Sequence, residues 1–339
     1  MPAEWEPHEA TWLAWPHEKT DWPGKFAPIP WVYGEFVRKL ARVERVRILV
    51  ADADAEREAC AVLGKSGADL AAIEFLRIPT NRSWTRDYGP IFVKNDEGKL
   101  AVTDWHFNGW AKYKNWKRDD AVTSKLLRRL KLPAWQPTSQ GRRIVLEGGS
   151  IDVNGRGTLL TTEECQLSPL QARNPGLERA ALEKIFGDYL GAWHVLWLRR
   201  GIAGDDTHGH VDDIARFVDP KTVVAVAEEN KSDANYERLQ ENLEMLRTMR
   251  VQDGRPLRVK VLPMPEPVYF DGQRLPASYA NFYIANKVVL VPTFNDPKDR
   301  IALDVLAGVF PDREMIGIAC LDLVLGLGTL HCMTQQQPA

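Results

Sequence analysis

The sequence repeats one pattern of predicted secondary structure about every sixty residues. Five amphipathic segments predict helices, and their starts are separated by 63, 58, 57 and 64 residues. These segments begin at Ala55, Arg118, Gly176, Asp233 and Pro297. Residue types that commonly start helices stand near three of them: Asp54, Asn174-Pro175 and Asp296-Pro297. A further amphipathic segment, from Trp31 to Glu44, precedes the first unit.

Short runs rich in β-branched and aromatic residues flank each predicted helix, which is typical of strands. The runs before the helices are VRILVAD, AVTDWHF, GTLLTTEE, TVVAVAEE and KVVLVPTF. Those after them are AIEFLRIP, the weaker AWQPT, HVLWLRR, RVKVLPMP and EMIGIAC, and a further run follows four times: GPIFVKN, SIDVNG, IARFVD and NFYIAN. Five units of strand, helix, strand and strand predict one closed, radially pseudo-symmetric α/β domain over residues 1–339. The alternative is ordinary α/β alternation with accidental spacing.

Composition and charge exclude several classes of protein. A chain with 44% hydrophobic and 27% charged residues is typical of a folded globular protein. The net charge of -2 offers no general attraction for nucleic acid or an anionic membrane, although a cationic substrate is compatible with it. Met1-Pro-Ala-Glu-Trp-Glu6 has no signal-peptide features, and no apolar run is long enough to span a membrane. We therefore expect a cytoplasmic protein, and a homodimer is compatible with the sequence.

Four scattered cysteines without a C-x-x-C pair predict reduced thiols rather than disulfides or a zinc site. Cys60 lies in a predicted helix, and Cys165 and Cys320 lie at strand ends, so we interpret these three as structural. Cys332 differs because it follows the turn Gly326-Leu-Gly328 and precedes a polar stretch, Thr334-Gln-Gln-Gln337. A nucleophile is one interpretation of Cys332, and an inert buried thiol is the other.

Polar motifs follow the five units at the same period. Successive separations along Asp87, Glu147, His210, Asn281 and Cys332 are 60, 63, 71 and 51 residues. Equivalent positions of a radial repeat converge near its central axis. The spacing therefore predicts that Asp87, Glu147, His210, Asp212 and Cys332 share one pocket.

His210 and Asp212 are two residues apart, which in a strand would place both on the same face. A histidine beside a carboxylate suits general acid–base chemistry, while a hydrogen-bonded core histidine is the alternative. A metal site is a third interpretation, because ligand-type residues crowd this stretch: Asp205, Asp206, His208, His210, Asp212 and Asp213. No third ligand cluster and no H-E-x-x-H spacing supports it, so we predict no metal and no cofactor.

Asp87 and Glu147 would add two carboxylates to the same pocket. Each also has a structural interpretation: Asp87 could form an ion pair with Arg86, and Glu147 could stand at a bulge in Glu147-Gly-Gly149. Clustered carboxylates repel one another unless a cation lies among them, and a planar guanidinium matches carboxylates in two-point contact. Twelve tryptophans, nine of them before residue 117, suit a pocket that stacks on a flat group.

These motifs resemble those of the agmatine deiminase and bacterial peptidylarginine deiminase family of guanidino-group modifying enzymes. The resemblance extends over essentially the whole chain. The motifs that carry it include Met1-Pro-Ala-Glu-Trp-Glu-Pro-His8, Trp12-Leu-Ala-Trp-Pro16, Trp84-Thr-Arg-Asp-Tyr-Gly-Pro90, Phe107-Asn-Gly-Trp110, Leu146-Glu-Gly-Gly149, Leu160-Thr-Thr-Glu-Glu-Cys165, Gly209-His-Val-Asp212, Ala277-Ser-Tyr-Ala-Asn-Phe282 and His331-Cys-Met-Thr-Gln-Gln336. It implies the pentein fold, a five-bladed α/β propeller around a central active site.

The resemblance also implies a role for each site residue. Cys332 matches the nucleophile, His210 the general acid and base, and Asp87 and Asp212 the carboxylates that hold the guanidinium. Glu147 matches a carboxylate that contacts the substrate or orients the histidine. Trp84 and Trp110 match aromatic residues of the substrate site.

The implied substrate is a small cationic guanidine, with agmatine as the first candidate. The implied reaction hydrolyses agmatine to N-carbamoylputrescine and ammonia through an amidino-cysteine intermediate. Free or peptidyl arginine is the alternative substrate, and a non-catalytic pentein binding protein is a distant one. Agmatine deiminases usually have Gly-Gly-Gly-Asn-Ile before the His-Cys pair, whereas this chain has Gly326-Leu-Gly-Thr-Leu330.

Overall fold

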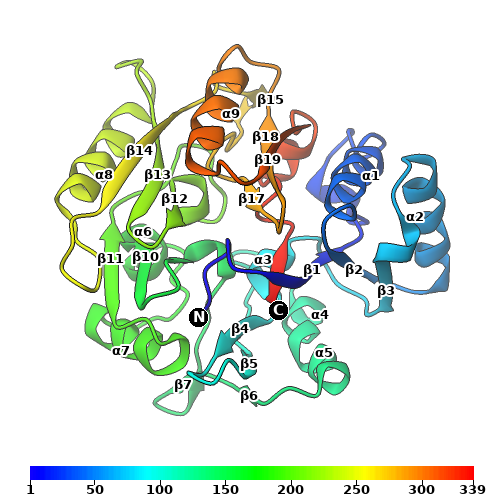
Figure 1. The fold of residues 1–339 in the computed structure, drawn as a ribbon, viewed down its shortest axis with the longest axis horizontal. Helices are drawn as coiled ribbons and strands as arrows, with labels where there is room; N and C mark the ends of the chain where they lie inside the picture. The colour runs from blue at the N-terminus through cyan, green and yellow to red at the C-terminus, as the bar shows by residue number, and fades with distance from the viewer.

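The computed structural model describes residues 1–339, and five sheets surround the middle of the molecule (Figure 1). The longer helices lie toward the periphery, and both chain ends lie toward the centre of the view. This arrangement agrees with the five repeated α/β units predicted from the sixty-residue period.

Four sheets share one order of three strands. The first strand pairs antiparallel with the middle one, which pairs parallel with the third. These sheets are β4 (Ile91–Lys94), β5 (Leu100–Thr103) and β6 (Ala134–Trp135); β9 (Asp152–Val153), β10 (Thr158–Thr162) and β11 (His194–Leu198); β12 (Ala215–Asp219), β13 (Thr222–Ala227) and β14 (Arg258–Pro263); and β17 (Tyr283–Ile284), β18 (Val288–Thr293) and β19 (Glu314–Ala319). Two hairpins stand apart: β7 (Thr138–Ser139) with β8 (Arg142–Arg143), and β15 (Tyr269–Phe270) with β16 (Gln273–Arg274).

The fifth sheet joins the two ends of the chain. Its order is β20 (Gln335–Pro338), β1 (His8–Ala14), β2 (Arg45–Val50) and β3 (Ile73–Arg77), with β20 antiparallel to β1 and the other pairs parallel. Neither β1 nor β20 was predicted as a strand. Three glutamines make β20 look like a surface segment, yet all three are buried and their amides are hydrogen-bonded. Trp12 Nε1, for example, donates to Gln337 Oε1 at 3.0 Å.

Helices connect the parallel strands on the outside, as the pattern predicted. The longer ones are α1 (Ile29–Leu40), α2 (Ala53–Lys65), α5 (Val122–Leu130), α7 (Arg179–Leu190), α8 (Tyr236–Thr248) and α9 (Lys298–Val309). The short ones are α3 (Thr85–Tyr88), α4 (Lys117–Asp120) and α6 (Glu163–Leu167), and 3-10 turns are η1 (Lys19–Asp21), η2 (Leu70–Ala72), η3 (Gly148–Ser150), η4 (Val211–Asp213) and η5 (Leu323–Gly326). No helix is long and apolar enough to cross a membrane.

Two of the predicted helix starts were wrong. Asp52, not Asp54, caps α2, because its side chain accepts from the first free backbone N–H groups of the helix. Helix α7 begins at Arg179, beyond Asn174-Pro175. The Asn174 side chain instead exchanges two hydrogen bonds with the backbone of Val145, at 2.9 and 2.8 Å, and so holds the segment that leads to Glu147.

Candidate active site

Cys332 lies in the connection between η5 and β20, and it is 7% exposed. The Arg86 backbone N–H donates to the Cys332 carbonyl at 3.2 Å, which ties the cysteine to α3. Asn281 Nδ2 donates to the sulfur at 3.1 Å, and Asp212 Oδ2 lies 3.7 Å from it. The thiol therefore has both a donor and an anion beside it.

The turn before Cys332 is tightly packed. Leu327 adopts a left-handed conformation with φ of 67°, which is unusual for a branched residue. At Gly328 a Cβ would lie 2.9 Å from the Trp84 ring and 3.1 Å from Cys332 Cβ, so only glycine fits there. The glycine thus allows the indole of Trp84 and the Cys332 side chain both to approach this turn closely.

His210 caps the 3-10 turn η4, and Asp212 lies within the same turn. The prediction that they alternate on one face of a strand was wrong, although the turn brings both side chains close to Gly149 and Asp87. Asp205 shapes this approach, because its Oδ2 accepts from the N–H groups of Gly209 and His210 at 2.7 and 3.2 Å. His210 Nδ1 lies 3.8 Å from Asp87 Oδ1 and 4.0 Å from Asp212 Oδ1.

The carboxylate of Asp87, on α3, is fixed by two donors. Trp110 Nε1 donates to Oδ2 at 2.8 Å, and the Gly149 N–H donates to Oδ1 at 3.1 Å. A Cβ on Gly149 would lie 2.6 Å from His210 Nδ1, 2.9 Å from Asp87 Oδ1 and 3.0 Å from Asp212 Oδ2. Gly149 is therefore the backbone position around which three site residues gather, which explains the Glu-Gly-Gly motif.

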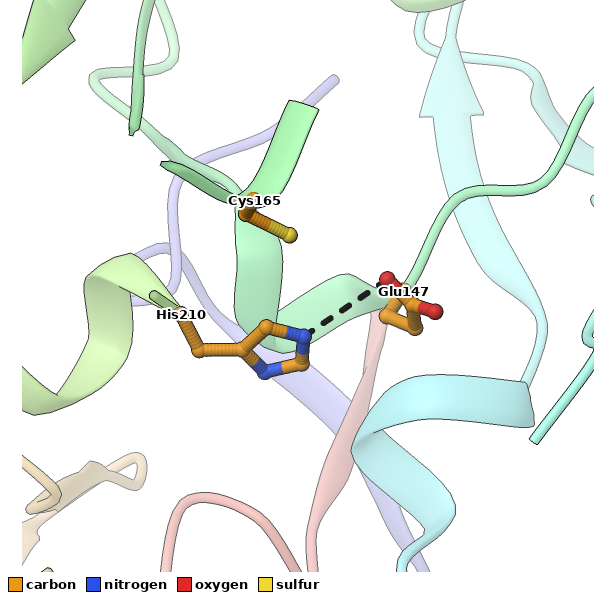
Figure 2. A group of neighbouring side chains, drawn as sticks. All are labelled: Glu147, Cys165 and His210. Atoms are coloured by element: carbon orange, nitrogen blue, oxygen red, sulfur yellow. Dashed lines mark ion pairs between the residues drawn. The ribbon is translucent and has the colours of Figure 1, made fainter. Parts of the chain in front are cut away.

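Glu147 approaches His210 from the opposite side of the ring. Figure 2 shows Glu147 and Cys165 grouped near the imidazole, with Nε2 directed at Glu147 Oε2, 3.6 Å away. Glu147 Oε1 accepts from Arg173 Nε at 3.0 Å, and both side chains are buried. Arg173 was missed from the sequence because nothing in its local pattern distinguishes it from a surface arginine.

Burial and charge shift the pKa of each site group. Burial raises the pKa of Asp87 to about 6, where the His210 cation opposes the shift and the carboxylates of Asp212 and Glu147 add to it. Burial alone would raise the pKa of Glu147, but Arg173 and His210 lower it to about 2. Burial opposes the charged form of His210, yet the neighbouring Asp87 carboxylate raises its pKa well above the usual value.

The pKa of the Cys332 thiol is raised by burial and, beyond that, by the carboxylates of Asp212, Asp213 and Asp87. A cation that entered between these groups would stabilise the thiolate. The arrangement therefore suits a nucleophile that becomes active when a positively charged substrate binds.

A cavity of about 240 Å³ opens onto Cys332. Its lining is Thr20, Asp21, Arg82, Trp84, Asp87, Trp110, Tyr113, Asp206, Thr207, Gly326, Leu327 and Cys332. Of the predicted residues, Trp84, Asp87, Trp110 and Cys332 line it directly, whereas His210, Asp212 and Glu147 lie behind that lining.

The outer lining holds two acidic groups that sequence reasoning did not assign to the cavity. Asp206 Oδ2 accepts from the Tyr113 hydroxyl at 2.7 Å, and its other oxygen pairs with Lys112. Asp21 accepts from Trp84 Nε1 at 3.1 Å and pairs with Arg82. Asp21 lies outside the sixty-residue phase, so only its place in three dimensions reveals it.

Glu147, Cys165 and His210 also form a group whose ligand atoms lie within 4.8 Å of one another, a spacing compatible with a metal ion. Arg173 already supplies the positive charge beside Glu147 and would repel a second cation. The acidic stretch that suggested a metal in the sequence divides instead: Asp205 holds the turn, and Asp206 faces the cavity. That the protein requires no metal stays a prediction.

A thiol at a cavity, with an imidazole and several buried carboxylates close to it, is an arrangement typical of cysteine enzymes that act on cationic substrates. The chain belongs to the Porphyromonas-type peptidyl-arginine deiminase family, which it matches over residues 1–338. It is 36% identical to the agmatine deiminase of Pseudomonas aeruginosa strain LESB58, an alignment that covers 100% of this chain and 95% of that one.

Solved structures agree in fold over the full length. The agmatine deiminase of Enterococcus faecalis is 33% identical with a TM-score of 0.91, and the match covers 100% of this chain and 95% of that one. A cysteine-to-serine variant of the C. jejuni agmatine deiminase with substrate bound is 31% identical with a TM-score of 0.87, covering 100% and 96%. The amidinotransferase SxtG of Microseira wollei, 12% identical with a TM-score of 0.51, shares the fold alone over 99% and 96%. The predicted α/β pentein fold and the family resemblance are confirmed.

Proposed function

We propose that this protein is an agmatine deiminase, which hydrolyses agmatine to N-carbamoylputrescine and ammonia. The observation that carries the proposal is the Cys332 thiol among buried carboxylates: Asp87 lines the same cavity, and Asp212 lies 3.7 Å from the sulfur. The full-length similarity to agmatine deiminases supports the same substrate class.

The guanidinium would bind between Asp87 and Asp212. Asp212 Oδ1 is buried without a hydrogen-bond partner, and an N–H of the guanidinium would satisfy it. Asp87, held by Trp110 and the Gly149 N–H, presents its charge in a fixed direction. The bound cation offsets the repulsion that raises the pKa of Cys332 and so favours the thiolate.

In the first step, the thiolate attacks the central carbon of the guanidinium and forms a carbon–sulfur bond. The carbon–nitrogen bond then breaks, and ammonia leaves with a proton from His210, which the neighbouring carboxylates keep protonated. In the second step, His210 removes a proton from water, which attacks the amidino carbon. The carbon–sulfur bond breaks, and the ureido product leaves. Glu147, paired with Arg173, stabilises the His210 cation before ammonia leaves and again after His210 has taken the proton from water.

The outer cavity distinguishes two substrates. The amine of agmatine is positive, and the Asp206 carboxylate in the lining, whose partner Lys112 is exposed, suits it better than Asp21, which is paired with Arg82. Arginine carries an additional carboxylate, and Arg82 in the same lining is the feature that favours it as the second candidate. Arg82 is already paired with Asp21 and stacked 4.2 Å over the ring of Tyr113, which leaves it less available for a substrate anion.

Ammonia release from agmatine, arginine and an arginyl peptide, measured side by side, tests the proposal. We expect agmatine to give the highest kcat/KM and Cys332→Ser to release no ammonia while it remains folded. Cys320→Ser is the matched control, because this buried free thiol lies after β19 and does not line the cavity. Retained activity in Cys332→Ser, or a preference for arginine, would contradict the proposal.

A further inference from the structure

His331, directly before the nucleophile, is held between two carboxylates and takes no part in the mechanism above. Its Nδ1 lies 2.7 Å from Asp212 Oδ2, and its Nε2 lies 2.8 Å from Glu4 Oε2. The ring is 1% exposed, and Glu4 and Asp212 are buried as well. The N-terminal segment, η4 and the nucleophile loop therefore meet through one imidazole.

Both ring nitrogens of His331 must donate if both carboxylates are ionised, because a carboxylate only accepts. Burial opposes the charge on Glu4, but Arg216, His331 and Arg86 keep the pKa of its carboxyl well below the usual range. His331 likewise lowers the pKa of Asp212 against the effect of burial. Arg86 and Arg216 also pair with Glu4, at 3.2 and 2.9 Å, so the geometry favours two accepting carboxylates and a ring that donates from both nitrogens.

The charged groups around this imidazolium come from four elements. Glu4 lies in the segment before β1, Asp212 in η4, Arg86 in α3 and Arg216 in β12. Arg216 also pairs with Asp152 of β9 at 3.2 Å. None of these charged groups lines the cavity, and His331 connects them to Asp212 and to the adjacent Cys332.

We propose that His331 is a positioning residue, an imidazolium held by hydrogen bonds to both Glu4 and Asp212, which fixes Asp212 beside the nucleophile. The hydrogen bond from Nδ1 engages Asp212 Oδ2 and leaves Oδ1 without a partner and so free to accept from the guanidinium. The positive ring also offsets the Asp212 charge 3.7 Å from the sulfur. The guanidinium contact rests on the proposed function, whereas the effect on the thiol does not.

In Glu4→Gln, the direction in which the pKa of the Cys332 thiol changes separates two explanations: Glu4 acts through His331, or it acts only as a distant negative charge. Ile284 N–H donates to Glu4 Oε1 at 2.8 Å, so the glutamine oxygen stays there and its NH₂ replaces Oε2. That NH₂ would donate to His331 Nε2, which favours the neutral ring. Losing the closer positive charge should raise the pKa of the Cys332 thiol. If Glu4 acted only as a distant negative charge, its removal would lower that pKa.

The measurement is the rate of alkylation of Cys332 by iodoacetamide at pH 8, followed by mass spectrometry of its peptide. Below the pKa of a thiol, the thiolate fraction falls about tenfold for each unit by which the pKa rises. We expect alkylation to be about tenfold slower in Glu4→Gln. Glu6→Gln, a partly buried carboxylate in the same segment, is the matched control and should react as the unaltered protein does. Faster or unchanged alkylation in Glu4→Gln, or equal slowing in Glu6→Gln, overturns the proposal.

His331→Gln and the double variant add a second measurement. If Glu4 acts through His331, the double variant should be no slower than His331→Gln alone, because both remove the same cation. Slowing factors that multiply would overturn the relay. In the ammonia assay, His331→Gln should raise KM for agmatine as well as lower kcat, since Asp212 loses its fixed orientation. An inactive unaltered protein that still showed the Glu4→Gln slowing would refute agmatine hydrolysis and leave the role of His331 intact.

Discussion

Asp87→Asn should inactivate the enzyme and at the same time stabilise its substrate-free fold. Burial raises the pKa of this carboxyl from 3.8 to about 6, roughly two units. At 1.36 kcal/mol per unit, the ionised form costs about 3 kcal/mol of stability at neutral pH. Asparagine avoids that cost and keeps the acceptor for the Gly149 N–H, but it loses the bond from Trp110, worth about 1 kcal/mol. The expected net gain is therefore about 2 kcal/mol.

The sign of this effect depends on pH. Because the folded-state pKa of Asp87 is the higher one, the destabilisation is complete above about pH 6 and disappears as the pH falls below 3.8. Urea unfolding at pH 7.5 should show the gain for Asp87→Asn, and unfolding at pH 4 should show none. Ammonia release should fall by at least about a hundredfold, since one full charge–charge contact with the substrate is lost. A variant that is less stable at pH 7.5, or equally shifted at both pH values, would refute this reasoning.

Three other predictions follow from the same geometry. Gly149→Ala should lower kcat/KM for agmatine by about a hundredfold, because its methyl group would lie 2.6 Å from His210 Nδ1. The ammonia assay measures kcat/KM, and circular dichroism checks that the variant is folded. Arg173→Met should lower the free energy of unfolding in urea by about 3–5 kcal/mol, because it leaves the Glu147 charge buried without its partner. The pH profile of kcat/KM should fall on the acid side near pH 6, where Asp87 gains a proton. Burial also raises the pKa of Asp119, to about 7, so Asp119→Asn is the control and should keep the acid limb. Loss of the acid limb in Asp119→Asn would show that the limb reports the protonation of Asp119 and not of Asp87.

Sequence periodicity predicted the helices, the five units and the convergence of five distant residues, because packing against a sheet imposes hydrophobic patterns on each element. It could not predict that His210 and Asp212 lie in a 3-10 turn, since a turn of three residues carries no periodic signal. The partner of Glu147 was also hidden. Arg173 is 26 residues away in the chain, and its burial depends on contacts that only the folded structure brings together.

The largest departure from the predictions, the paired chain ends, also explains the place of the nucleophile. Strand β20 pairs antiparallel with β1, with Gln336 opposite Thr11, so the residues just before β20 are held at the middle of the molecule. An apolar strand would have been easy to recognise, but the side chains here must satisfy buried polar groups, including Arg86, which donates to Gln336 Oε1 at 2.7 Å. The same pairing brings Glu4 to His331. The polar character that concealed β20 in the sequence is therefore what links the first residues of the chain to the cysteine near its end.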